Sequence, residues 1–92
     1  MKRIKLDGKK MTSRTKTHEY LMKKFKFPDY YGKNLDALAD CLSEIGEPTE
    51  VRIVNEKDMT ENLGNQYKGF IRVFKDISEQ NKNLIFKFET TE

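Results

Sequence analysis

The chain has 92 residues, enough for one domain, and we expect residues 1–92 to form a single unit with a net charge of +3. Hydrophobic and charged residues each make up 36% of the chain, and six Phe and four Tyr supply material for a core. One cysteine and one histidine exclude an internal disulfide and a Cys/His metal cluster, and no stretch approaches the ~18 apolar residues of a membrane span.

The first part of the chain predicts a strand followed by a helix. Residues 2–7 alternate between polar and apolar types, as a strand does, and Asp7-Gly8 favours a turn. Apolar positions at helical spacing predict a helix over about 15–25, with His18 at its surface or boundary. Pro28 prevents this helix from continuing.

A second helix is predicted over 35–45, with Asn34 as its N-cap and Gly46 as the residue that closes it. Apolar side chains recur on one side of this helix: Leu35, Leu38, Leu42 and Ile45. Acidic side chains step by four along the other side: Asp36, Asp40 and Glu44. Cys41 lies between the two sides, and we expect it to be a small core residue.

The remaining elements alternate between strand and helix. Residues 50–54 and 84–88 read as strands, residues 56–62 predict one helical turn, and a helix is predicted from residue 67 to about residue 81. Strands separated by helices favour an α/β fold with a parallel sheet. The pattern leaves the order of the strands open.

The sequence offers little for catalysis. A nucleophile and base pair would need His18 with Cys41 or a hydroxyl, and the glycines are too dispersed for a phosphate loop. Asp36 and Asp40 could form a carboxylate pair or a Mg²⁺ site, but no second element clearly adds oxygen ligands. We therefore expect a protein that is not an enzyme, with no cofactor and no metal.

The acidic side of the second helix has two interpretations. Acids four residues apart repel by about 0.2–0.5 kcal/mol, so a helix selected only for stability would place lysines among them. The face is either the solvated side of an amphipathic helix or a surface for a cationic partner.

Residues 28–48, PDYYGKNLDALADCLSEIGEP, resemble the signature region of the barstar family, whose members are intracellular inhibitors of a secreted bacterial ribonuclease. The matching residues are Tyr30-Tyr31-Gly32, Asn34 to Leu38, and Asp40-Cys41-Leu42. The resemblance implies a single barstar-like domain over residues 1–92. The implied domain has an α/β fold in which a single three-stranded parallel sheet packs against three to four helices.

The resemblance also implies a function: plugging a ribonuclease active site with carboxylates that mimic RNA phosphates. The implied partner is a small basic ribonuclease or a related nuclease toxin, and we expect a cytoplasmic protein that is monomeric when free. Asp40 aligns with the main inhibitory carboxylate, Asp36 with a second one, and Tyr30 with an aromatic contact, whereas we expect Tyr31 to pack in the core. The full set of implied contact residues is Tyr30, Asn34, Leu35, Asp36, Ala39, Asp40, Ser43, Glu44 and Asp76.

The chain departs from the family pattern at several of these positions. Ala39 stands where the best-known member has a tryptophan, and Ser43 and Glu44 replace a Gly-Trp pair. Asp76 replaces a longer acid, and Gln80 stands at the position of a further acid. Because large aromatic residues are frequent hot spots, these departures are compatible with a related but different nuclease and with an inherited fold that has a changed role.

Two alternatives remain. One is an immunity or protein-binding module against a different toxin. The other is a basic nucleic-acid-binding domain, because residues 1–28 hold ten basic residues against two acidic ones, whereas residues 29–50 hold six acidic residues against Lys33. The lysines and arginine available for nucleic acid are Lys9, Lys10, Arg14, Lys16, Lys23, Lys24 and Lys26. No aromatic RNA-binding motif accompanies them, so we do not expect nucleic acid as the partner.

Overall fold

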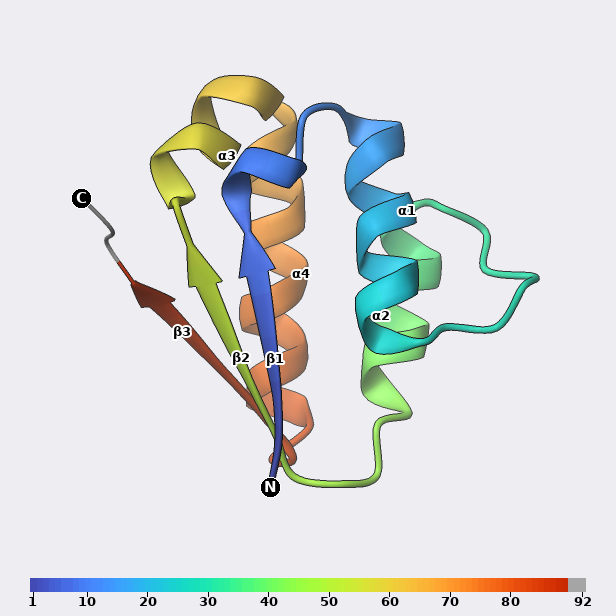
Figure 1. Cartoon of the computed structure of the whole chain (residues 1–92). Coiled ribbons are helices and arrows are strands. Elements are labelled where there is room, and N and C mark those ends of the chain that lie inside the picture. The colour runs from blue at the N-terminus through green and yellow to red at the C-terminus, as the bar shows by residue number, and fades with distance from the viewer. Residues whose placement is uncertain (90–92) are drawn as a thin grey trace.

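The computed structural model describes residues 1–89, which form three strands, four α-helices and a short 3-10 helix (Figure 1). In chain order the elements are β1 (Lys2–Asp7), η1 (Gly8–Lys10), α1 (Arg14–Phe25), α2 (Leu35–Ser43), β2 (Thr49–Val54), α3 (Glu56–Leu63), α4 (Gln66–Gln80) and β3 (Leu84–Glu89). The strands form one parallel sheet in the order β1-β2-β3, so the predicted α/β fold with a three-stranded parallel sheet is confirmed.

The core lies between one face of this sheet and the helices. Alternate residues of the strands, such as Leu6 and Ile53, are fully buried and meet the aromatic stripe of α4, whose Phe74 is also fully buried. Helix α1 packs on β1, α4 packs on β3, and α2 packs on α4 (Figure 1). Leu38 and Leu42 of α2 are fully buried, which leaves the opposite side of that helix on the surface.

The other face of the sheet carries charged side chains that pair across the strands. The guanidinium of Arg52 on β2 donates two hydrogen bonds of 2.7 Å to the Glu89 carboxylate on β3. Glu50 lies 3.3 Å from Lys87 and 3.9 Å from Arg3. Parallel sheets are ordinarily covered on both faces. Here the cross-strand ion pairs allow one face to remain in contact with water.

Helix α2 begins as predicted but ends earlier. The Asn34 side chain accepts a 2.8 Å hydrogen bond from the Ala37 amide, which confirms the N-cap. The last helical residue is Ser43, and Gly46 does not take the left-handed conformation of a closing glycine. A distant residue binds this end of the helix instead, because Asn81 donates through its Nδ2 to the carbonyls of Leu42 and Ile45, both at 3.0 Å.

Two further predictions were wrong. Helix α3 has two turns rather than one, because Met59 and Leu63 are both buried and anchor it to the core. His18 is fully buried rather than at the surface or boundary, with its ring 4.9 Å from that of Phe70 and its Nδ1 2.7 Å from the Tyr31 hydroxyl oxygen. Tyr31 is buried in the core, as predicted.

Candidate partner-binding face

The acidic side of α2 is open to solvent. Asp36, Asp40 and Glu44 are all exposed, and so is Asp76 on the neighbouring helix α4. Within residues 1–89, none of these four carboxylates forms an ion pair or accepts a side-chain hydrogen bond. They are therefore available to an external cation without first breaking an internal contact.

Asp40 stands between two hollows of the surface, and it lines both of them. The first, which we call the α2/α4 hollow, has a volume of about 300 Å³ and lies between those helices. Its lining residues are Ala39, Asp40, Ser43, Val73, Asp76, Ile77 and Gln80. The second, which we call the tyrosine hollow, has a volume of about 280 Å³ and lies between α2 and the loop that precedes it. It is lined by Pro28, Tyr30, Tyr31, Gly32, Ala37, Asp40, Cys41 and Glu44.

Tyr30 projects from this loop with 88% of its surface exposed. The residue after it holds the loop in place, because the Tyr31 amide donates a 3.0 Å hydrogen bond to the Pro28 carbonyl and the Tyr31 hydroxyl meets His18 in the core. An exposed aromatic ring on an anchored backbone loses little further freedom when a partner covers it. Tyr30 and Asp40 are thus presented together from two different segments.

Six of the nine predicted contact residues line these two hollows: Tyr30, Ala39, Asp40, Ser43, Glu44 and Asp76. The other three do not. Asp36 lies one turn away on the same exposed side of α2, and Asn34 is occupied in capping the helix. Leu35 is partly buried and packs against α4, where a side-chain carbon placed on Gly69 would come within 2.8 Å of the Leu35 Cδ1 atom.

Sequence reasoning named Asp76 and Gln80 on the α4 wall of the α2/α4 hollow but missed its apolar part, Val73 and Ile77. Val73, Ile77 and Gln80 belong to the helix whose apolar stripe was assigned to the core. Their spacing of i, i+4 and i+7 places them on one side of that helix, and this spacing is the sequence signal that could have found Val73 and Ile77.

The carboxylates create a negative field that reaches Cys41, a half-buried residue in the wall of the tyrosine hollow. The pKa of the Cys41 thiol is raised, first by burial and then by the nearby charges of Glu44 and Asp40. Helix α2, which the structure describes in full, carries no basic residue that would cancel this field. Among residues 1–89 there is no cluster of three or more potential metal ligands, and none of the described helices is long and apolar enough to cross a membrane.

These features define a small α/β protein that presents carboxylates and an aromatic ring on one rigid face. The chain belongs to the barstar family: the family model described as "Barstar (barnase inhibitor)" matches residues 1–91. It is also similar to a protein of Bacillus subtilis (strain 168) named "Putative ribonuclease inhibitor YrdF". The two are 33% identical over 84 residues, which cover 90% of this chain and 92% of the relative.

Proposed function

We propose that this protein inhibits a ribonuclease inside the cell by inserting the acidic side of α2 into the enzyme's active site. The observation that carries the proposal is the unpaired, exposed carboxylate of Asp40, flanked by two hollows and by the ring of Tyr30. Family membership and the name of the B. subtilis relative support the same role.

The mechanism is mimicry of RNA phosphates. Ribonucleases bind phosphate oxygens with arginine, lysine and histidine side chains, and a carboxylate accepts the same charge-assisted, partly bidentate hydrogen bonds. Asp40 takes the place of the phosphate at the bond to be cleaved, and Asp36, one helical turn away, meets a second cationic group. Tyr30 covers the catalytic residues from the side of the loop.

The α2/α4 hollow indicates how the partner differs from the one that the best-known family member inhibits. Ala39 has a small side chain where the best-known family member has a tryptophan, and an open space of about 300 Å³ lies beside it. Its walls are apolar at Val73 and Ile77 and acidic at Asp40 and Asp76. This arrangement suits an arginine or lysine side chain of the partner, with its methylene groups on the apolar wall and its charge between the two carboxylates.

The test is an inhibition assay against a panel of small bacterial ribonucleases. Truncating one member of a desolvated charge pair costs about 2–5 kcal/mol, so we expect Asp40→Ala to weaken inhibition by at least about thirtyfold. Glu61→Ala removes the same charge from an exposed position on α3 and is the matched control. Equal inhibition by Asp40→Ala and Glu61→Ala would refute the role of Asp40.

A substitution in the α2/α4 hollow tests the nature of the contact separately. Ala39→Trp fills the hollow and should reduce inhibition of the partner while leaving the buried side of α2 intact. Unchanged inhibition would show that no partner side chain enters the hollow. Absence of inhibition across the panel, together with capture of another toxin through Asp40, would favour the immunity role instead.

A further inference from the structure

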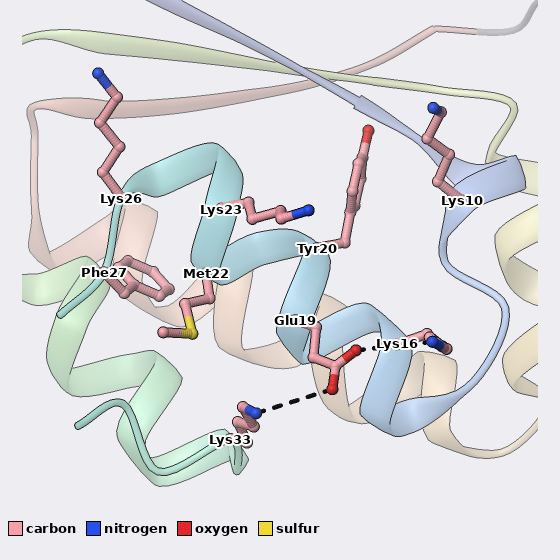
Figure 2. A pocket seen from close by; sticks show the side chains of 9 residues that line it. All are labelled: Lys10, Lys16, Glu19, Tyr20, Met22, Lys23, Lys26, Phe27 and Lys33. Atoms are coloured by element: carbon pink, nitrogen blue, oxygen red, sulfur yellow. Dashed lines mark ion pairs between the residues drawn. The ribbon is translucent and has the colours of Figure 1, made fainter. Parts of the chain in front are cut away.

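A third hollow lies on a positively charged part of the surface and is lined mainly by lysines (Figure 2). This lysine hollow has a volume of about 640 Å³, with Tyr20, Met22 and Phe27 as its less polar lining. The remaining lining residues are Lys10, Lys16, Glu19, Lys23, Lys26 and Lys33.

The positive charge of this hollow is mostly uncompensated. Glu19 is its one acidic residue, at 3.9 Å from Lys16 and 3.8 Å from Lys33. Lys10, Lys23 and Lys26 form no ion pair with any described residue. Such a concentration of like charge repels itself and is relieved by a bound anion.

Two of these lysines occupy backbone positions that are unfavourable for lysine. Lys26 has φ 59° and ψ 47° at the C-terminal end of α1, where glycine or asparagine is usual, and Lys33 has φ 54°. Within residues 1–89, the only other non-glycine residue with positive φ is Asn55, a residue type that tolerates it. A left-handed residue commonly ends a helix, but lysine in this conformation costs more than glycine would, which makes Lys26 and Lys33 the two positions to test for a function of the side chain.

The aromatic lining is held in fixed orientations. The Tyr20 hydroxyl accepts a 2.9 Å hydrogen bond from the Asp7 amide, which positions a ring that is only half-buried. Phe27 stacks on Phe25 with 5.4 Å between ring centroids and packs against Tyr31 at 4.9 Å. Fixed aromatic rings among lysines are the combination that binds single-stranded nucleic acid, because bases stack on the rings while phosphates meet the cations.

We infer that the lysine hollow binds single-stranded nucleic acid, with phosphates on Lys26, Lys33 and their neighbours and a base on Tyr20 or Phe27. The lysines favour a chain over a free nucleotide because they come from separate segments: η1, both ends of α1, and the loop before α2 (Figure 2). The lysines lie apart from one another, which suits contacts to successive phosphates of a strand. The sequence offers no glycine-rich loop that would enclose a single phosphate. The inference is independent of the proposed inhibition of a ribonuclease.

The test measures binding of a labelled oligouridine by fluorescence anisotropy at several salt concentrations. Lys26→Gly/Lys33→Gly removes two charges and also relieves the backbone strain, so the variant should unfold at the same temperature as wild type or higher. Loss of two phosphate contacts should weaken binding about 25-fold at 0.1 M salt and reduce the salt slope by about 1.4. Lys57→Ala/Lys82→Ala removes two charges outside the hollow and is the matched control.

Two further probes separate the components of the site. An abasic strand of the same length should bind more weakly than oligouridine, and uridine monophosphate should not displace oligouridine at equal nucleotide concentration. Equal loss in the two double variants would overturn the inference, as would displacement by the monophosphate. Equal affinity of the abasic strand would overturn the base contact, and a lower unfolding temperature of the glycine variant would remove the argument from strain.

Discussion

Acidification should destabilise the fold through His18, which is neutral and fully buried. Its pKa is lowered from 6.5 to about 4, first by burial and then by the positive charge of Arg14. One ring nitrogen meets the Tyr31 hydroxyl, whereas Nε2 has no hydrogen-bond partner within the described residues. A second proton would therefore place an unpaired N–H group and a charge beside the ring of Phe70.

The size of the effect follows from the difference between the folded and unfolded pKa values. The unfolded chain binds the proton at higher pH than the folded chain, so the stability that His18 provides is complete above pH 6.5 and declines as the pH falls toward 4. Between pH 7 and pH 5 this linkage removes about 2 kcal/mol of unfolding free energy.

Urea unfolding followed by circular dichroism at pH 7 and pH 5 measures this loss in wild type and in His18→Gln. Glutamine keeps a polar group near Tyr31 but does not titrate, so the wild type should lose about 2 kcal/mol more than the variant. The comparison is internal to each protein, which removes any cost of the substitution itself. An equal loss in both proteins would refute the assignment of a lowered pKa to a buried, neutral His18.

Three other substitutions test the packing and the charge of the fold. Gly8→Ala should destabilise the protein by about 3 kcal/mol in urea unfolding, because the added carbon would lie 2.0 Å from the carbonyl oxygen of Asn55; an unchanged midpoint would contradict this close approach. Asn81→Ala should cost about 1–3 kcal/mol in the same assay, since it removes two hydrogen bonds to the Leu42 and Ile45 carbonyls at about 0.5–1.5 kcal/mol each. A loss below about 0.5 kcal/mol would mean that water, or the second donor that each carbonyl already has, replaces the Asn81 side chain. Asp40→Asn should raise the unfolding free energy of the free protein, because the acids Asp36 and Glu44 lie one turn before and after Asp40. We expect a gain of about 0.2–0.5 kcal/mol for each repulsion that is removed. A decrease would show that the Asp40 charge stabilises the helix.

Helix α2 shows which features a sequence pattern can predict. The spacing of leucines and acids determines which side of the helix faces the core, so the exposure of Asp36, Asp40 and Glu44 was predictable from periodicity alone. The end of the same helix was not predictable, because its carbonyls are bound by Asn81 from the end of α4. Nothing near Gly46 in the sequence indicates that contact.

His18 and the lysine hollow illustrate the same limit. His18 has polar neighbours in the sequence and was predicted at the surface or boundary, but its position three residues before the buried Leu21 places it toward the core. The lysines of the hollow come from η1, from α1 with its C-cap and from the loop before α2, and only the fold brings Lys10 and Lys33 to the same surface. Local periodicity carries no information about such contacts between elements.

The central claim is that the acidic side of α2 enters the active site of a ribonuclease. Amide chemical shifts of the ¹⁵N-labelled protein, recorded while a ribonuclease that it inhibits is added, locate the contact directly. The account predicts that the largest changes occur at Tyr30, along the exposed side of α2 around Asp40, and at Asp76. Changes confined to the open face of the sheet or to the lysine hollow, with α2 unaffected, would contradict it.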